Sequence, residues 1–560
     1  MIYGMRLPIV LALILFTGGV DLDGQAQRPL PPSTLRAPTR AEVVKGEYGR
    51  YRANNDLLHY DLDIKVDPVK KWLGGKNTIR FKMLKDDTRI QLDLVPYMNI
   101  DRIVLGTEPL KYERDLTAVY IDFPSTLRSG RTYEIEFHYS GNPVETGRFD
   151  GFAFKKDADG HDWINTANEG EGASLWWPCK DQWRDEPEGM EIKIAVPNDL
   201  INVSNGRFIA KTALGDGYTK WHYRVHYPIN AYNVSVNAAR YVNFGEKMGD
   251  LTLDYYVLPG SLEKAKQQFA QAKPMIEAFE KYFGEYPFKK DGFKLIEVPY
   301  SGMEHQSAVT YGNRFANGYL ERDWTGVGVS LKFDFIIIHE SAHEWFGNAV
   351  SAADQADMWI HEAWATYLEC LYVEHMFGYD DALRYINGYK SKIANAEPIV
   401  IQRGIYRSPN QDQYFKGALF LHTLRSVLND DAKWWKLLRD LYAEFKYRNI
   451  FTEDLVAFVN KQLGQDLTPI FDQYLRRAAL PVLEVTYNDA DKTIAYRWNA
   501  AERGFAMPLK VEVAGTPMRI TPTTTHWQTL PGGADQLKVP VDRYYIEVAT
   551  LDARGRPIKP

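Results

Sequence analysis

A His-Glu-x-x-His sequence, His339-Glu340-Ser-Ala-His343, is the segment of this chain with the clearest capacity for chemistry. Four residues of helix turn the chain by about 400°, so the two imidazoles lie one above the other on one face. They can therefore bind one metal ion, while Glu340 lies beside that ion without having to ligate it. The apolar run that precedes His339 indicates a buried helix rather than a pair of histidines on a solvated helix face.

A third ligand is needed, because catalytic zinc takes three protein ligands and keeps one position open. A second predicted helix, 357–369, supplies Glu362. The 18 residues 344–361 are enough to end one helix, turn, and begin another that packs against it. Among common metals, zinc fits two imidazoles and a carboxylate best. We therefore predict one zinc ion per chain, held by His339, His343 and Glu362.

Two further motifs flank this metal site in the sequence. Upstream, residues 300–306 read Tyr-Ser-Gly-Met-Glu-His-Gln, and downstream, residues 412–416 read Asp-Gln-Tyr-Phe-Lys. In their order and spacing, these motifs resemble the M1 family of zinc aminopeptidases, which belongs to the gluzincins. That family combines His-Glu-x-x-His, 18 residues and a Glu with an upstream Gly-x-Met-Glu-Asn and a downstream Tyr. The resemblance covers nearly the whole chain that follows the N-terminal signal predicted below.

The resemblance implies a role for each matching residue. Glu340 corresponds to the general base of the family and Tyr414 to the residue that stabilises the oxyanion. Glu304 corresponds to the carboxylate that binds the free α-amine of the substrate. A further amine-binding residue stands in the family nine residues before a Pro-Cys pair, which here is Pro178-Cys179 and indicates Glu169. Glu171 is close enough in sequence to remain an alternative to Glu169.

The sequence departs from the family pattern at two places near the site. His305 and His361 each stand where the family usually has Asn, and Ala363-Trp364 replaces the usual Gly-Phe. A larger, titratable ring at either position is expected to alter the hydrogen bonds on the substrate side. These departures concern the amine-binding part of the site and leave the zinc ligands unchanged.

We therefore predict a hydrolase, a zinc-dependent aminopeptidase that acts on peptides with a free N-terminus. A metal ion lowers the pKa of bound water, and a carboxylate such as Glu340 can take the proton of that water. One alternative within the enzymes is a gluzincin with endopeptidase or epoxide hydrolase activity, since one M1 branch opens a lipid epoxide. Another is a catalytically silent protein that binds peptides.

Composition places the chain among ordinary globular proteins. It has 560 residues, of which 45% are hydrophobic and 25% charged, and it contains 41 Gly, 29 Pro and 2 Cys. These values exclude a disordered chain, a collagen-like repeat and a disulfide scaffold. The formal net charge of −6 indicates no broad basic surface, so we expect no nucleic-acid partner. Cys179 and Cys370 are expected to be unpaired and buried, although a disulfide between them is not excluded by the sequence.

The N-terminus has the features of a secretory signal, and we assign it to residues 1–26. Arg6 precedes a run of ten mostly apolar residues, 7–16, and small and polar residues follow. The run is too short for a bilayer span of about 20 residues, so we expect no stable membrane insertion. A weak membrane anchor is the alternative. The protein is thus predicted to be exported, to the periplasm or the medium, behind a Pro-rich leader, 27–40.

The hydrophobic patterning predicts an α+β multidomain architecture. Apolar and polar residues alternate in segments such as 59–66 and 191–196, which predicts an N-terminal antiparallel β domain over 41–250. Helical periodicity begins at Leu262, and the resemblance implies a thermolysin-like, mainly helical catalytic domain over 251–478. Strand patterns return in segments such as 482–487 and predict a C-terminal β-sandwich domain over 479–560.

Overall fold

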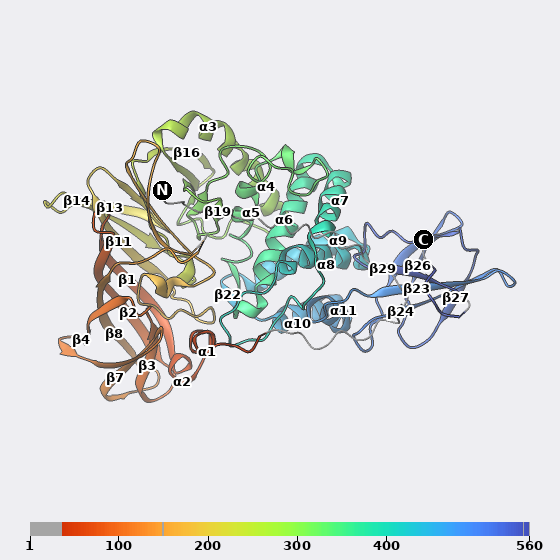
Figure 1. Cartoon of the computed structure of the whole chain (residues 1–560), viewed down its shortest axis with the longest axis horizontal. Coiled ribbons are helices and arrows are strands. Elements are labelled where there is room, and N and C mark those ends of the chain that lie inside the picture. Colours follow the sequence, from red (N-terminus) through yellow and green to blue (C-terminus); the bar gives the residue numbers. More distant parts are fainter. Residues whose placement is uncertain (1–35, 148–149, 553, 559–560) are drawn as a thin grey trace, which may run out of the picture.

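The structure is a computed structural model that describes residues 36–147, 150–552 and 554–558. β-sheets at one end, helices in the middle and further sheets at the other end follow one another along the long axis (Figure 1). This arrangement confirms the predicted α+β multidomain architecture. The predicted signal, 1–26, and residues 27–35 of the leader lie outside the described residues. The described chain enters its first helix, α1, at Arg40.

The N-terminal part is built on an eight-stranded sheet in the order β13-β14-β11-β1-β2-β8-β4-β5. All neighbouring strands in it are antiparallel except β1 and β11, which pair in parallel. Every second residue of β1 from Tyr60 to Val66 is buried, as the alternating sequence requires of a sheet with one covered face. The bounds are β1 Asn55–Asp67, β2 Trp72–Met83, β4 Met98–Leu105, β5 Glu108–Pro109, β8 Thr132–Gly141, β11 Met190–Pro197, β13 Arg207–Ala213 and β14 Tyr218–Val225.

Two smaller sheets complete this part, and one of them leads to the site. The four-stranded sheet runs β12-β15-β10-β9, with β9 Asp150–Lys156, β10 Asp162–Asn168, β12 Ile201–Val203 and β15 Asn237–Ala239. Strand β10 ends directly before Glu169. The three-stranded sheet runs β3-β7-β6, with β3 Asp87–Asp93, β6 Lys111–Asp115 and β7 Ala118–Leu127. Helices α1 Arg40–Gly46 and α2 Arg50–Ala53 precede β1.

The central part begins with a five-stranded sheet in the order β16-β17-β18-β20-β19. Its edge strand β19, Gly302–Met303, leads directly into Glu304. The other strands are β16 Val242–Met248, β17 Leu251–Val257, β18 Phe293–Glu297 and β20 Val309–Tyr311. The helical periodicity from Leu262 yields two helices, α3 Leu262–Gln268 and α4 Ala272–Tyr282, separated by a 3-10 turn. Pro274 has no backbone N–H, so it fits the first turn of α4 but not the interior of one long helix.

The remaining helices surround α6, Trp359–Phe377, whose first fifteen residues are all buried. A helix that is buried on every side suits a rigid site, because its side chains are held by packing. Around it lie α5 Phe335–Ala342, α7 Tyr379–Gly388, α8 Asp412–Leu428, α9 Asp431–Phe445, α10 Thr452–Leu463 and α11 Thr468–Leu475. Two short strands, β21 Val350–Ala352 and β22 Arg448–Ile450, pair in parallel beside them.

The C-terminal part consists of two sheets, β27-β24-β23-β29 and β26-β25-β28. Their inward residues, including Leu483, Ile494 and Trp498, belong to the same hydrophobic core as the central helices. The C-terminal sheets therefore pack on the helical part rather than standing apart from it. Their bounds are β23 Val482–Asn488, β24 Thr493–Asn499, β25 Leu509–Val513, β26 Thr516–Ile520, β27 Gln528–Pro531, β28 Leu537–Lys538 and β29 Glu547–Leu551.

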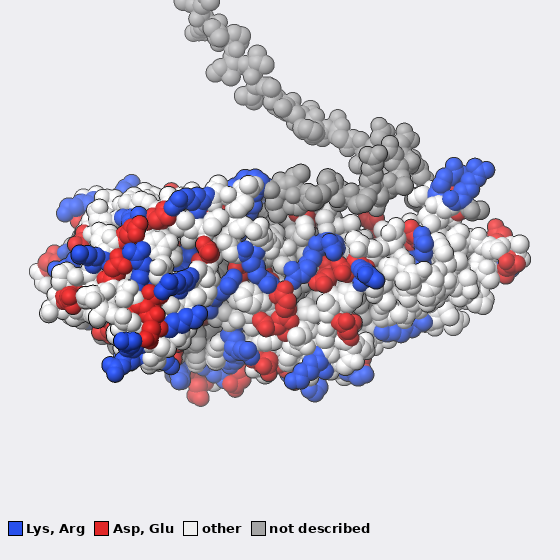
Figure 2. Space-filling view, turned by 90° about the horizontal axis from the view of Figure 1, so that it is seen from below, with Lys and Arg blue, Asp and Glu red and all other residues white. Residues whose placement is uncertain are grey.

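The surface and the cysteines agree with the composition. Acidic and basic side chains are interspersed on the face seen in Figure 2, with no broad area of one sign. Cys179 and Cys370 are free and buried, as predicted. Among the described residues, no helix combines the length and the apolar character needed to cross a bilayer.

Candidate metal centre and active site

Helix α5 presents the two histidines because its start is firmly capped. The Asp334 carboxylate accepts hydrogen bonds from the backbone N–H groups of Ile336 at 3.1 Å and Ile337 at 3.2 Å. Such an N-cap satisfies donors that have no partner within the helix. The helix ends at Ala342, but His343 keeps helical dihedrals, φ −62° and ψ −19°. His339 and His343 therefore project from one face, and both are buried, which excludes a pair on a solvated surface.

Glu362, in the first turn of α6, completes a set of three converging ligand atoms. The Nε2 atoms of His339 and His343 each lie 3.5 Å from Oε2 of Glu362. No hydrogen-bond donor satisfies this buried carboxylate oxygen among the described residues. Two imidazole nitrogens and a carboxylate oxygen within 4.8 Å of one another are the donor set of a catalytic zinc site. The residues therefore fit the predicted zinc ion.

Each imidazole is oriented by a hydrogen-bond acceptor beside its Nδ1 atom, and neither of these acceptors was predicted from the sequence. Nδ1 of His339 lies 2.6 Å from Oε1 of Glu369, and Nδ1 of His343 lies 3.0 Å from the Phe346 carbonyl oxygen. An Nδ1 that donates leaves Nε2 free to ligate a metal. The available signal was the spacing from Glu362 to Glu369, since seven residues are two helical turns and place both carboxylates on one face.

Glu369 is itself held by two phenols. Its Oε2 accepts hydrogen bonds from the hydroxyl groups of Tyr385 at 2.6 Å and Tyr389 at 2.5 Å. Helix α7 supplies Tyr385, and the turn that follows α7 supplies Tyr389. The position of His339 thus depends on residues up to 50 positions away in the chain, which no local pattern could reveal.

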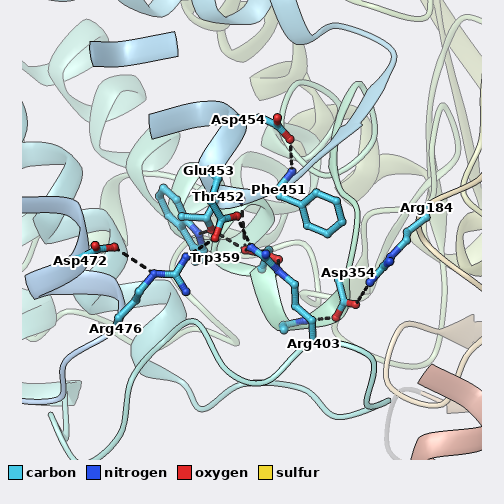
Figure 3. Close-up of polar contacts among 12 residues, drawn as sticks. Arg184, Asp354, Trp359, Arg403, Phe451, Thr452, Glu453, Asp454, Asp472 and Arg476 are labelled. Carbon is cyan, nitrogen blue, oxygen red and sulfur yellow. Dashed lines mark hydrogen bonds and ion pairs between the residues drawn. The ribbon is translucent and has the colours of Figure 1, made fainter. Parts of the chain in front are cut away.

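The start of α6 is fixed by a polar network (Figure 3). The buried Asp357 accepts two hydrogen bonds from the Arg403 guanidinium, at 2.6 and 2.8 Å, and one from the Thr452 hydroxyl at 2.5 Å. The indole of Trp359 donates to the same hydroxyl at 2.8 Å. Because Glu362 follows five residues after Asp357, this network determines where the third ligand lies.

The same region joins the N-terminal part of the chain to the helical part. Arg184 donates to Asp354 at 2.9 Å, and the backbone N–H of Gly404 donates to the same carboxylate at 3.1 Å (Figure 3). Asp354 lies just before α6, so the contact places the N-terminal sheets against the end of α6 that carries Glu362.

Glu340 lies between the two histidines and under strand β19. Burial raises its pKa to about 7. A Cβ at Gly302 would lie 3.1 Å from Cγ of Glu340 and 2.6 Å from Cγ2 of Ile336. Only glycine therefore lets the edge strand pass this closely over α5. The carboxylate of Glu340 is thereby held in a buried position beside the metal ligands.

Glu304 lies at the end of the same edge strand and also faces the ligands. One of its carboxylate oxygens lies within 4.8 Å of ligand atoms of both Glu340 and His343. The Tyr232 hydroxyl donates to Oε1 of Glu304 at 3.1 Å. Burial raises the pKa of Glu304. Tyr232 was not singled out by sequence reasoning, and it reaches the site from the N-terminal part of the chain.

Glu169 comes to the same place from the turn after β10. Burial, and then the negative charges of Glu304 and Glu362, raise its pKa well above the usual range. Its Oε1 is buried, and no hydrogen-bond partner for it is found among the residues that the structure describes. The alternative Glu171 is exposed, and its charge acts on Tyr97. The geometry thus favours Glu169 over Glu171 as a residue of the site.

Tyr414, near the start of α8, lies against the metal ligands. Its ring stacks on that of His339, with centroids 6.1 Å apart and planes 25° from parallel. Burial, and then the charge of Glu362, raise the pKa of its hydroxyl well above the usual value. The hydroxyl therefore remains protonated at neutral pH and can donate a hydrogen bond.

The two histidines that depart from the family pattern are buried and neutral. Burial lowers the pKa of His305 and of His361 to about 3. The ring of His361 lies parallel to that of Trp183, with centroids 5.0 Å apart, and Trp183 stacks on Tyr232. Nε2 of His361 accepts from the backbone N–H of Ala352 at 2.8 Å. His361 thus supports the aromatic stack behind Glu304 and adds no charge to the site.

Comparison with known families agrees with this geometry. Residues 57–232 match the Peptidase M1 N-terminal domain, and residues 267–474 match the Peptidase family M1 domain. Together the two matches cover more than half of the chain. The chain belongs to peptidase family M1.

Relatives within M1 are distant in sequence. The chain is 22% identical over 458 residues to Probable aminopeptidase 2 of Sulfurisphaera tokodaii, a match that covers 75% of this chain and 57% of that protein. It is 25% identical over 456 residues to Endoplasmic reticulum aminopeptidase 1 of Homo sapiens, a match that covers 76% of this chain and 47% of that protein. The chain thus spans about half the length of these curated relatives.

Solved M1 structures share the fold. The M1 zinc metallopeptidase of Deinococcus radiodurans, solved as a mutant bound to a Tyr-Ser-Ala substrate, superposes with a TM-score of 0.63 at 21% identity. The match covers 77% of this chain and 96% of that chain. A second structure of the mutant has a TM-score of 0.64 at 22% identity. Zinc is the cofactor that the M1 family and the three converging ligands indicate.

Replacing Glu369 by Gln tests the orientation of His339. One amide oxygen cannot accept from both His339 and the two tyrosines, and the amide NH₂ would oppose one of these donors. We expect zinc affinity to fall by about 10- to 100-fold, the usual effect of losing a partner behind a metal ligand. Competition with a chelator measures the change.

The matched control is Glu374→Gln, on the same helix but paired with Arg425 at a distance from the site. Its zinc affinity is expected to equal that of the wild type. Equal affinity in Glu369→Gln as well would contradict the role assigned to this carboxylate.

Proposed function

We propose that this chain is a zinc-dependent aminopeptidase that removes the N-terminal residue from peptides. One observation carries the proposal: the carboxylate of Glu304 and the Oε1 atom of Glu169 are buried beside the zinc ligands, and no lysine or arginine of the described chain pairs with either carboxylate. Buried charges without partners are costly. A substrate ammonium group is the charge that this site lacks.

The position of these carboxylates explains the restriction to the first peptide bond. Glu304 lies within 4.8 Å of Glu340 and of one zinc ligand, so an amine bound there has its own carbonyl group next to the metal. An interior peptide bond offers no ammonium group and would leave both carboxylates without a partner. The Tyr232 hydroxyl, bonded to Glu304, directs that carboxylate. Two carboxylates then orient one amine.

The residues around the metal supply the chemistry of hydrolysis. His339, His343 and Glu362 would hold the ion, which lowers the pKa of a water molecule and polarises the scissile carbonyl when bound. Glu340 would accept a proton from the attacking water and pass it to the leaving nitrogen. The protonated Tyr414 hydroxyl donates a hydrogen bond to the oxyanion.

Replacing Glu340 by Gln removes the proton acceptor and keeps the size of the side chain. We expect kcat on leucine p-nitroanilide to fall by about 10²- to 10⁴-fold, the range for loss of a general base. Zinc content, measured by elemental analysis, should stay at one ion per chain. A chelator should abolish the wild-type activity, and added zinc should restore it.

An unchanged turnover in Glu340→Gln would contradict the mechanism. A wild-type protein that holds zinc but hydrolyses no aminoacyl substrate would favour a silent peptide-binding protein instead.

Replacing Glu304 by Ala tests the amine anchor. Loss of a buried charge partner costs about 2–5 kcal/mol, so kcat/KM on free-amine peptides should fall by at least about 30-fold. Zinc content should be unchanged, because Glu304 is outside the two-His, one-Glu set. Substantial zinc loss would instead favour the other possible ligand group, Glu304, Glu340 and His343.

A peptide and its N-acetylated form provide the matched substrates for this variant. The wild type should cleave only the free-amine peptide. Equal cleavage of both would overturn amine anchoring and favour an endopeptidase. Turnover of an epoxide in place of peptides would favour the epoxide hydrolase alternative.

We also propose that the protein is exported, to the periplasm or the medium, after removal of a signal that ends near residue 26. The basis is Arg6 followed by the apolar run 7–16 and small residues. Mass spectrometry of the protein purified from its own cells should find a mature N-terminus close to residue 27 in the exported fraction. An intact N-terminus in the cytoplasmic fraction would contradict export.

A further inference from the structure

A cavity of about 320 Å³ lies next to the candidate site, between the N-terminal and central parts of the chain. Its walls include Asn165 and Ala167 of β10 and Tyr300 and Ser301, which directly precede β19. Both of these segments lead to a proposed amine anchor, β10 to Glu169 and β19 to Glu304. The wall residues therefore lie two to four positions before the proposed anchors along the two segments.

An extended peptide bound along β19 would run into this cavity. Strand β19 ends its sheet, so one of its two edges pairs with no strand in the part of the chain that the structure describes and can accept an extended chain. A peptide anchored by its amine at Glu304 runs antiparallel to β19, toward Ser301. At about 3.3 Å per residue, the three steps from Glu304 to Ser301 span about 10 Å. The third or fourth residue of the substrate then reaches the cavity.

Among the described residues in the wall of the cavity, one cation has no charged partner. Nζ of Lys155 pairs with Oε2 of Glu145 at 2.6 Å, and both residues line the cavity. Arg314 also lines it, and no side chain in the described ranges forms a hydrogen bond or ion pair with its guanidinium. Since the Lys155–Glu145 pair is neutral, Arg314 makes the cavity positive. An unpaired guanidinium is suited to bind a carboxylate through two parallel hydrogen bonds.

The backbone of Arg314 is held in a defined position relative to the metal helix. The Asn313 side chain donates to the carbonyl oxygens of Ala316 and Gly318, each at 2.8 Å, and to Asp334 at 2.9 Å. Asp334 is the residue that caps α5. Arg314 has a φ of 62°, a left-handed conformation that a non-glycine residue keeps only when its surroundings impose it.

The loop is also fastened to the peptide-binding segment. The backbone N–H of Gly312 donates to the Ser301 carbonyl oxygen at 2.8 Å. A Cβ on Gly312 would lie 1.6 Å from the Tyr300 carbonyl oxygen, so the two segments touch through their backbones. These backbone contacts fix the position of Arg314 relative to the segment that leads to Glu304.

We propose that Arg314 binds a carboxylate carried by the third or fourth residue of the substrate. For a tripeptide or tetrapeptide that group is the C-terminal carboxylate; in a longer peptide it is an acidic side chain at the same position. This inference rests on the proposed aminopeptidase function. It assigns short peptides with a free C-terminus as the preferred substrate class.

The first experiment compares Leu-Ala-Ala with its C-terminal amide. We expect wild-type kcat/KM to favour the acid by about tenfold, as one charge-assisted hydrogen-bonded pair at an exposed site provides. The preference should appear mainly in KM, because this contact is equal in ground and transition states. It should also shrink as salt is added. In Arg314→Ala the ratio of acid to amide should fall to about one, and Arg314→Lys should restore part of it.

The control is Arg322→Ala, which removes the same charge from the same loop. Arg322 is exposed and does not line the cavity, so the ratio of acid to amide should match that of the wild type. Hydrolysis of leucine p-nitroanilide, which ends before Arg314, reports folding and the central chemistry in all variants. Equal cleavage of acid and amide by an active wild type would overturn the inference.

A second pair of substrates separates the two sources of the carboxylate. Leu-Ala-Glu-Ala-amide and Leu-Ala-Gln-Ala-amide differ only in the charge of the third side chain. A preference for the Glu peptide that Arg314→Ala removes would support an acidic side chain as ligand, and a preference confined to the tripeptide acid would support the C-terminus. If the wild type hydrolyses none of these peptides and no p-nitroanilide, the proposed function fails before this inference is reached.

Discussion

The accumulation of buried negative charge is the constraint on which this site depends. Five glutamates converge in one region, and among the described residues the basic groups beside them are the imidazoles of His339 and His343; the glutamates are Glu169, Glu304, Glu340, Glu362 and Glu369. Carboxylates so close together cannot all remain ionised without compensating charge. A divalent ion held by His339, His343 and Glu362 would supply part of that charge, and under the proposed function a substrate ammonium group would supply more. Metal binding and the proposed amine binding would thus both supply positive charge to the same group of carboxylates.

The rest of the fold holds these charged side chains together, because packing and hydrogen bonds prevent them from moving apart. Helix α6 is buried on every side, and its start is tied down by Asp357, Arg403 and Thr452. Helix α5 is capped by Asp334 and covered by β19, where only a glycine fits. Because packed helices and saturated hydrogen-bond networks resist displacement, the ligands keep their geometry in spite of their mutual repulsion.

Local sequence patterns could predict the central chemistry but not its surroundings. The ligands of α5 follow from helical periodicity, and Glu362 follows from the length of one connection and from a family resemblance. Glu369 could have been reached from its spacing to Glu362. Tyr232 and Tyr385 could not, because they arrive from other parts of the chain. For the same reason Glu169 and Glu171 were inseparable in sequence, and the parallel pairing of β1 with β11 had no local signal.

The central part and the N-terminal part of the chain contribute different residues to the site, and this separation bears on substrate specificity. The metal ligands, Glu340 and Tyr414 all belong to the central helical part, whereas Glu169 and Tyr232 come from the N-terminal sheets. The two parts are joined close to the site, where the Tyr300 hydroxyl donates to the Thr166 carbonyl oxygen at 3.0 Å. Changes in how these parts dock would therefore alter the proposed amine anchors and the neighbouring cavity while leaving the metal-ligand set intact. Substrate choice can diverge within such a fold without any change in the hydrolytic chemistry.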